Sequence, residues 1–367
     1  MQFTLARETL LKPLQQVVGV VERRQTMPIL SNLLVEVSAD NNLLLTSTDL
    51  EVEMTAQCAL AEGQPGTATV PARKWFEIIR ALPDGVNIRG ELTADRLLLR
   101  AGRSRYTLAT LPANDFPILE GIDVVDRLTI SESVLRSLME RTAFAMATQD
   151  VRYYLNGLLF DLRDARLRCV ATDGHRLAMA EAVLPGSQAS AKQIILPRKG
   201  VQQLMGLLVN DEGEVELELA QNHLRLRRRE ASFTSKLIDG KFPDYEAVIP
   251  IGADQIVEID RDSLRTALQR AAILSNEKYR GVKLEFSEQT LRIVAHNPEQ
   301  DEAVEEIEVQ TQIHDLAVGF NVSYMLDAIA VLQGQQVRIS LRDAQSSCLL
   351  EATEDATARY VVMPLRL

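Results

Sequence analysis

The stretch LRCVATDGHRLAM at residues 167–179 decides the fold, because two related stretches of this 367-residue chain match it. LLLTSTDLEVEM at 43–54 and LRIVAHNPEQDEA at 291–303 share its alternating apolar run and the polar corner that follows. The corner falls at aligned positions separated by steps of 124 residues, which are Thr48, Thr172 and His296. A constant step over the whole chain indicates several copies of one structural unit.

Further features recur around this stretch. The same step of 124 residues connects three positions at the start of apolar runs, which are Asn32, Asn156 and Arg280. Each copy also carries two amphipathic helical patterns. These patterns lie at 7–21, 70–83, 132–146, 196–208, 262–274 and 320–332. Ser131 and Asp260 are suitable N-caps for two of the helices, and Pro13 predicts a late start or a kink in the first.

The remaining residues of each copy form short runs with apolar side chains at every second position. We therefore predict an α+β fold of three repeated domains, each with two helices packed on antiparallel sheet. The predicted domains are 1–122, 123–249 and 250–367. Each copy ends in a strand pattern (YTLATL, SFTSKL and RYVVMPL), so we expect the sheets of neighbouring copies to join edge to edge.

The composition is that of an average soluble globular protein, with 46% hydrophobic and 25% charged residues. No apolar run reaches the roughly 18 residues that a membrane helix needs. Arg7 and Glu8 interrupt the N-terminal apolar residues, which is not the pattern of a signal peptide. Cys58, Cys169 and Cys348 are far apart, so we expect neither a disulfide nor a metal site, and the cytoplasm as the compartment.

The net charge of −11 argues against a protein that simply coats nucleic acid. Basic residues are nevertheless clustered, at 21–26, 71–74, 101–106, 197–200 and 225–229. Acidic residues collect elsewhere, as at 297–308. Either the basic clusters face a partner while the acidic ones face solvent, or both are ordinary solvated edges.

An acid–base pair is one reading of Asp173 and His175 within the opening stretch. The aligned copies carry Glu51 and Glu299 in place of His175. The chain contains no nucleophile–base–orienter set, no HExxH, no GxxxxGK[ST] and no GxGxxG pattern. Since Asp and Gly favour tight reversals between strands, we expect a turn here, and an enzyme using Asp173 and His175 remains the alternative.

The chain resembles the bacterial sliding clamp family, the DNA polymerase III beta subunits, over its full length. The resemblance lies in the stretches QDVRYYLNG, VATDGHRLA, PRKG, FTSKLIDGKFPDY, ILSNEKYRG, HNPEQ, GFNVSY and YVVMPLRL. It implies a non-catalytic protein without cofactors, which forms a head-to-tail homodimer of six domains around duplex DNA. The partners that it implies are a clamp loader, replicative and translesion polymerases, and mismatch-repair and other proteins with clamp-binding peptides.

The repeat agrees with this implied ring, because a head-to-tail dimer of three-domain chains closes with approximate six-fold symmetry. Strand-rich ends place the dimer edges near 103–111 and 324–333. A ring holds DNA by topology, so its contacts should be few, directed to phosphates and blind to sequence. A three-domain structural protein that never meets DNA is the other competing class.

The resemblance also implies which residues contact DNA. They are Arg24, Arg73, Gln149, Tyr153 and Tyr154. Two adjacent tyrosines cannot both point inward along a strand, so the residues alone predict one packed ring and one surface ring. Glu22 and Arg23 stand where the family resemblance leads us to expect glycines, which puts the flexibility of this loop in doubt.

A second implied site is an apolar cleft between the second and third domains, where peptides of clamp partners dock. Its residues are Leu155, Thr172, Gly174, His175, Arg176, Leu177, Pro243, Val248, Tyr324, Ser347, Val361, Met363, Pro364, Leu365 and Arg366. Without the resemblance, residues 361–367 read as a final strand. Ala247 and Gln345 depart from the expected basic and small apolar residues, so we expect altered peptide preference at the rim.

Overall fold

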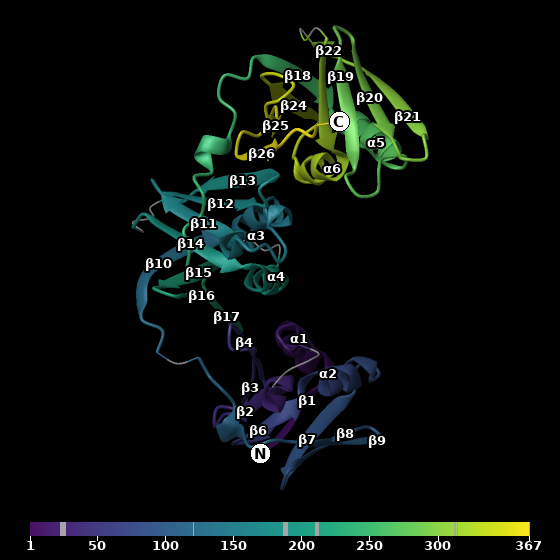
Figure 1. Ribbon diagram of the computed structural model, residues 1–367. Coiled ribbons are helices and arrows are strands. Elements are labelled where there is room, and N and C mark those ends of the chain that lie inside the picture. Colours follow the sequence, from purple (N-terminus) through teal and green to yellow (C-terminus); the bar gives the residue numbers. More distant parts are fainter. Residues whose placement is uncertain are drawn as a thin grey trace. The chain divides into compact units, whose positions relative to one another are not determined.

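The computed structural model describes residues 1–22, 27–119, 121–185, 190–209, 213–311, 313 and 315–366. Helices are separated by runs of consecutive antiparallel strands in these residues, which confirms the predicted α+β class (Figure 1). No helix among them is long and apolar enough to cross a membrane.

The first repeat contains α1 (Arg7–Val17) and α2 (Ala72–Ala81). Its strands are β1 (Gln2–Ala6), β2 (Asn32–Val37), β3 (Asn42–Thr48), β4 (Val52–Ala59), β5 (Glu62–Gln64), β6 (Gly66–Pro71), β7 (Asn87–Thr93), β8 (Arg96–Ala101) and β9 (Ser104–Ala109). Short 3-10 turns, η1 (Pro28–Ser31) and η2 (Ala113–Asp115), join them. α1 begins at Arg7 and contains Pro13, so the predicted late start is wrong.

The second repeat contains α3 (Glu132–Glu140) and α4 (Arg198–Leu207). Its strands are β10 (Val124–Ser131), β11 (Gly157–Arg163), β12 (Arg166–Thr172), β13 (Arg176–Val183), β14 (Lys192–Pro197), β15 (Glu214–Ala220), β16 (His223–Arg228) and β17 (Ala231–Lys236). Three 3-10 turns complete it, η3 (Ala143–Ala145), η4 (Tyr153–Leu155) and η5 (Glu246–Val248).

The third repeat contains α5 (Arg261–Ala272) and α6 (Val322–Val331). Its strands are β18 (Gln255–Asp260), β19 (Gly281–Phe286), β20 (Thr290–His296), β21 (Glu302–Glu308), β22 (Gln310–Thr311), β23 (Leu316–Asn321), β24 (Gln336–Leu341), β25 (Cys348–Ala352) and β26 (Ala358–Val362). The carboxylate of Asp260 accepts a hydrogen bond from the Ser263 amide at 2.8 Å, which confirms the predicted N-cap of α5.

The step of 124 residues appears directly in the strands. β3, β12 and β20 each span seven residues and end at the aligned positions Thr48, Thr172 and His296. The predicted second helices also recur, as α2, α4 and α6, each of ten residues. The three-fold repeat is therefore a property of the fold as well as of the sequence.

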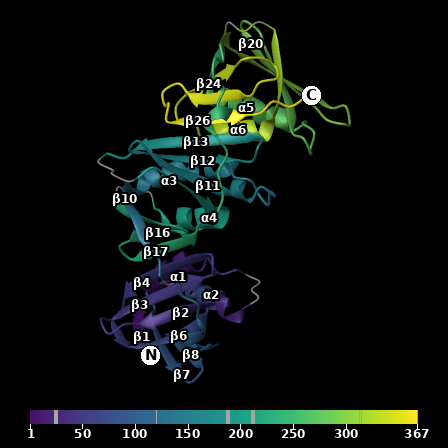
Figure 2. The ribbon, with the colours of Figure 1, turned by 60° about the vertical axis from the view of Figure 1, so that its left-hand side comes forward.

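One compact unit comprises residues 1–133 and 199–237. Its described strands form a five-stranded sheet, in the order β5-β1-β7-β8-β9, and an eight-stranded sheet, in the order β10-β15-β16-β17-β4-β3-β2-β6. The eight-stranded sheet joins two repeats where β17 pairs antiparallel with β4 (Figure 2). α1 packs on β3 and β4 and against α2, with Leu10, Leu14 and Val17 turned into the core.

The other compact unit comprises residues 134–198 and 238–367. Its described strands form a nine-stranded sheet, in the order β14-β11-β12-β13-β26-β25-β24-β18-β22, and a four-stranded sheet, in the order β21-β20-β19-β23. The nine-stranded sheet joins the second and third repeats where β13 pairs with β26 (Figure 2). This division follows the joined sheets, and the domain boundaries at 122 and 249 remain a prediction.

Edge-to-edge joining was expected of the strand at the end of each repeat, and it is confirmed for two of them. β17 and β26 pair with a strand of the preceding repeat. β9, at the end of the first repeat, pairs only with β8 among the described strands and forms an open edge. β21 is the corresponding open edge in the third repeat, whereas residues 324–331 belong to α6 and supply no strand edge.

Candidate functional site

The corner at Thr172–Arg176 is a hydrogen-bonded turn. The Thr172 hydroxyl donates to the Arg176 carbonyl at 2.6 Å and accepts from the Gly174 amide at 3.1 Å. Asp173 Oδ1 accepts from the amides of His175 and Arg176, at 2.9 and 3.0 Å. Gly174 has a φ of 87°, a left-handed conformation that favours glycine. These side chains shape the backbone of a reversal between β12 and β13.

The same contacts argue against an acid–base pair of Asp173 and His175. Asp173 Oδ2 pairs with Arg176 Nε at 3.1 Å, so both of its oxygens are bound within the turn. The His175 imidazole instead lies nearly parallel to the Tyr324 ring, with centroids 6.5 Å apart and an interplanar angle of 21°. Asp173 therefore does not orient His175 as a general base, and the residues that the structure describes hold no His, Cys, Asp and Glu group suited to a metal ion.

An apolar cavity of about 180 Å³ opens beside this turn. Its lining comprises Arg152, Leu155, Thr172, Gly174, Arg176, Leu177, Pro243, Tyr245, Val248, Val361 and Met363. The floor is part of a buried cluster that includes Leu155, Leu177 and Val361, with Val248 packed against it. The structure thus brings together most of the predicted cleft residues.

The joined sheet explains how residues so far apart in sequence meet. Leu177 on β13 stands directly opposite Val361 on β26. The Met363 amide donates to the His175 carbonyl at 2.9 Å, which continues this pairing beyond the strand ends. The cavity therefore exists because the strand that ends the third repeat completes the sheet of the second.

The other predicted cleft residues lie around this cavity without lining it. Tyr324 is half-buried on α6 and contacts His175, and Ser347 lines a neighbouring hollow of about 390 Å³. Both departures from the family pattern, Ala247 and Gln345, line that hollow too. The remaining predicted residues follow the last strand, Pro364 and Leu365 half-buried and Arg366 exposed.

Arg152 and Tyr245 line the cavity but were not predicted. Arg152 pairs with Asp150 through Nε and Nη2, at 3.0 and 2.8 Å, and this bond lowers the pKa of Asp150 to about 2. Its Nη2 also donates to the Asp173 carbonyl at 3.3 Å, which places the guanidinium over Gly174. Both residues stand inside quoted stretches, QDVRYYLNG and FPDY, but nothing in the sequence shows that they turn toward the cavity.

Of the predicted DNA contacts that the structure describes, three are exposed and one, Tyr154, is half-buried. Arg73 is exposed at the start of α2 and donates to the Val21 carbonyl at 2.5 Å, and Gln149 is exposed. Tyr153 is 54% exposed, whereas Tyr154 packs against the buried cluster. These tyrosines lie on η4, so the assumption of a strand is wrong, but one packed and one surface ring are observed. Arg24 lies outside the described residues.

The segment before Arg24 is anchored at Glu22. Its carboxylate accepts from Lys199 Nζ at 2.6 Å. Lys199 also pairs with Asp49, and these hydrogen bonds oppose the effect of burial and raise the pKa of Lys199. Glu22 is thus tied to α4 in this chain, as a glycine could not be.

Comparison with known proteins decides the family. The models of the DNA polymerase III beta subunit match three consecutive segments, the N-terminal domain at 1–120, the central domain at 129–244 and the C-terminal domain at 246–366. The chain belongs to this family. The beta sliding clamps of Pseudomonas putida KT2440 and Escherichia coli K12 are 52% and 48% identical to it, over the whole of both chains.

Solved clamp structures share its fold. The DNA polymerase III subunit beta of Pseudomonas aeruginosa superposes with a TM-score of 0.96 at 51% identity, covering all of both chains. A Pseudomonas aeruginosa clamp bound to griselimycin gives the same values. The Caulobacter crescentus pol III beta matches with a TM-score of 0.94 at 38% identity over all of both chains. The sliding clamp chain is accordingly a non-catalytic processivity factor of DNA polymerase III.

Proposed function

We propose that the cavity beside Leu177 receives side chains of the linear peptides through which polymerases and other partners attach to this clamp. The observation that carries the proposal is an apolar cavity with an open, polar lip. Its volume of about 180 Å³ is below the roughly 300–1,000 Å³ of ordinary small-molecule sites, so it suits one or two anchoring side chains. The griselimycin-bound relative supports ligand binding by clamps of this fold.

The lining suits an extended peptide. Met363 is half-buried at the mouth, and its unbranched thioether can adjust to different side chains. Gly174 lets the Arg152 guanidinium lie close over the turn at the lip, since an added Cβ there would lie only 2.9 Å from it. The carbonyls and hydroxyls of the turn supply polar groups at the lip.

The test is a fluorescence-polarisation titration of a labelled clamp-binding peptide from a replicative polymerase. Saturable binding that Met363→Ala weakens is expected. Equal binding by wild type and Met363→Ala would place the peptide elsewhere. Leu177→Ala serves as a second variant, in the floor of the cavity.

We also propose that two copies pair β9 with β21, and do so twice in a closed head-to-tail dimer. β9, β17 and β26 are equivalent strands of the first, second and third repeats. β4, β13 and β21 form a second equivalent set, and in the two observed junctions β17 pairs with β4 and β26 pairs with β13. Among the described strands, β9 and β21 are the two members of these sets left open. Pairing them removes both open edges.

The two observed junctions also predict the register of this pairing. In those junctions Glu53 stands opposite Thr234 and Leu177 opposite Val361. The equivalent pairs in the proposed junction are Glu302 with the partner's Thr107 and Val304 with the partner's Arg105. The charges are complementary. Exposed arginines mark the first-repeat edge (Arg96, Arg100, Arg103 and Arg105), and exposed acids mark β21 (Glu302, Glu306 and Glu308).

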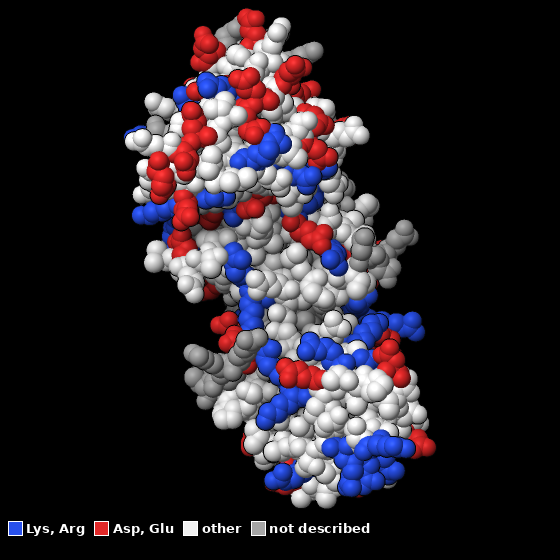
Figure 3. Space-filling model, turned by 90° about the vertical axis from the view of Figure 1, so that its right-hand side faces the viewer, with Lys and Arg blue, Asp and Glu red and all other residues white. Residues whose placement is uncertain are grey.

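Figure 3 shows the same contrast, with Lys and Arg gathered on the first repeat at the foot of the view and Asp and Glu over the third at its top.

For DNA, we propose weak, phosphate-directed contacts through Arg24, Arg73, Gln149 and Tyr153, with Tyr154 supporting Tyr153. Their rings meet edge to face, with centroids 5.8 Å apart. Such contacts hold a duplex without reading its sequence.

A further inference from the structure

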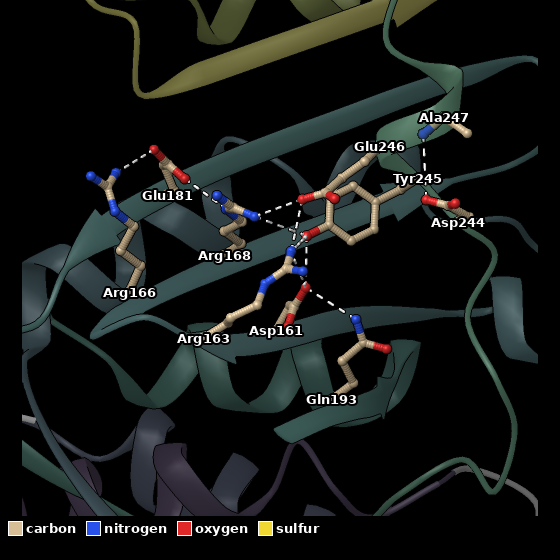
Figure 4. Close-up of polar contacts among 10 residues, drawn as sticks. All are labelled: Asp161, Arg163, Arg166, Arg168, Glu181, Gln193, Asp244, Tyr245, Glu246 and Ala247. Atoms are coloured by element: carbon tan, nitrogen blue, oxygen red, sulfur yellow. Dashed lines mark hydrogen bonds and ion pairs between the residues drawn. The ribbon is translucent and has the colours of Figure 1, made fainter. Parts of the chain in front are cut away.

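A row of polar side chains crosses four neighbouring strands beside the cavity (Figure 4). Gln193 of β14 stands opposite Asp161 of β11, which stands opposite Arg168 of β12, which stands opposite Glu181 of β13. The next row on the same face is apolar, with Ile195, Leu159, Val170 and Met179 in the buried cluster beneath the cavity. Alternation along the strands puts both rows on one face.

The segment Phe242–Ile249 lies over these two rows. Phe242 and Tyr245 pack into the apolar cluster, and Val248 and Ile249 contact it from its margin. Pro243, Tyr245 and Val248 form one wall of the cavity. Since the segment forms no strand in the described structure, ladder hydrogen bonds do not fix this wall.

Side chains from the polar row hold the segment instead. The Tyr245 hydroxyl donates to Asp161 Oδ2 at 2.7 Å, and Gln193 donates to the same oxygen at 3.0 Å. Burial and this hydrogen bond raise the pKa of Tyr245. The Asp161 side chain is 3% exposed, so its bond to Tyr245 is shielded from water.

Two arginines donate hydrogen bonds to the next residue, Glu246. Glu246 Oε1 accepts from Arg163 Nη2 at 2.7 Å and from Arg168 Nη1 at 2.9 Å. Arg168 also donates to Glu181 on its own sheet face, through Nε at 2.7 Å, so its bond to Glu246 uses a different nitrogen. Beyond Glu246 the chain turns, with the Val248 amide donating to the Tyr245 carbonyl at 3.2 Å.

We propose that Arg163 and Arg168 are positioning residues for the peptide cleft. With Asp161, they fix the wall from Pro243 to Val248, so affinity depends on side chains that do not line the cavity. The inference rests on the proposed peptide-binding function. An isolated exposed ion pair contributes little, but two arginines on one carboxylate beside a shielded hydrogen bond restrain a segment that no ladder holds.

The test compares two carboxylates that accept from Arg168. Glu246→Ala releases the wall, whereas Glu181→Ala removes a bond on the sheet face and leaves the wall in place. We expect Glu246→Ala to weaken the labelled polymerase peptide about fivefold in the polarisation assay. Glu181→Ala should stay within about twofold of wild type, and Glu246→Gln, which keeps an acceptor oxygen, should regain part of the loss.

Local amide hydrogen exchange, measured alongside the melting temperature, distinguishes a released wall from a change in overall stability. Amides of 244–249 should exchange faster in Glu246→Ala and at the wild-type rate in Glu181→Ala, with equal melting temperatures. Tyr245→Phe, which keeps the ring in the cavity, should also speed exchange. Wild-type affinity in Glu246→Ala, or equal weakening by Glu181→Ala, would overturn the inference. If Leu177→Ala and Met363→Ala still weaken the peptide in that event, the proposed function stands; if neither does, that function has failed.

Discussion

Arg176 Nη1 lies 2.5 Å from Asp327 Oδ2, which ties the start of β13 in the second repeat to α6 in the third. The same guanidinium lies over the Tyr324 ring, with its Cζ 4.5 Å from the centroid, and Tyr324 contacts His175 in turn. Arg176, which lines the cavity, thus contacts both Asp327 and Tyr324 of α6. The two repeats are held together there by charge and ring contacts as well as by the β13–β26 ladder.

Met363→Ala should weaken peptide binding about tenfold, because an apolar anchor at a binding hot spot contributes roughly 1–3 kcal/mol. Leu177→Ala should weaken it as much, although truncating this buried residue also costs about 2–5 kcal/mol of stability. His175→Ala should have a smaller effect, since its ring lies on Tyr324 outside the cavity. Fluorescence polarisation with each variant, alongside a check that it remains dimeric, measures these effects.

Replacing both Arg24 and Arg73 by Ala should lower the slope of log K against log salt by about 2 for linear duplex DNA. The physical reason is the loss of two counterion-releasing phosphate contacts. Binding of wild type should be weak and indifferent to sequence. An unchanged slope, or a strong preference for one sequence, would contradict the DNA assignment.

Arg105→Glu should shift the protein toward monomer, because it would set a third acid between Glu302 and Glu306 on the same face of the proposed β9–β21 junction. Adding Glu302→Arg and Glu306→Arg to the same chain should restore the dimer. Sedimentation velocity over a concentration series reads both results. Dimerisation of Arg105→Glu at wild-type strength would remove this strand from the interface.

The cysteines should resist thiol reagents in the folded protein at pH 8. Burial raises the pKa of Cys58 and Cys348 to about 12, and it also raises that of Cys169, so the reactive thiolates are scarce. A colourimetric thiol assay should report slow labelling in buffer and three thiols in denaturant.

The same shift gives stability a pH dependence. The unfolded thiols lose their protons near pH 9, whereas folded Cys348 keeps its proton until about pH 12. Between these values the folded state binds more protons, so the free energy of unfolding should fall as pH rises. Urea unfolding at pH 8 and pH 10.5 should show a smaller fall for Cys348→Ala than for wild type, and equal falls would contradict the shift.

Local patterns were enough to predict the turn and the helices, whereas the cleft residues were named only through the family resemblance. Thr172, Asp173 and Gly174 specify a reversal by their own chemistry, and the structure uses each as a turn residue. Arg152 and Tyr245 escaped prediction because their roles depend on contacts with Gly174 and Asp161, which lie 22 and 84 residues away in sequence. The tyrosine pair was placed on a strand because a 3-10 turn of three residues has no periodic signal.

By itself, the sequence determined the three-fold repeat, the α+β class and the order of helices and strands. The spacing of apolar residues and the 124-residue step between repeats can both be recognised in short stretches of sequence. Only the tertiary structure decided which edges meet. β17 joins β4, β26 joins β13, and the latter junction sets Leu177 opposite Val361 to form the cavity. Strand pairing between repeats is non-local, so no short window of sequence specifies it. The same holds for the hydrogen bonds to Glu246, because Arg163, Arg168 and Glu246 become neighbours only after the chain folds back over its own sheet.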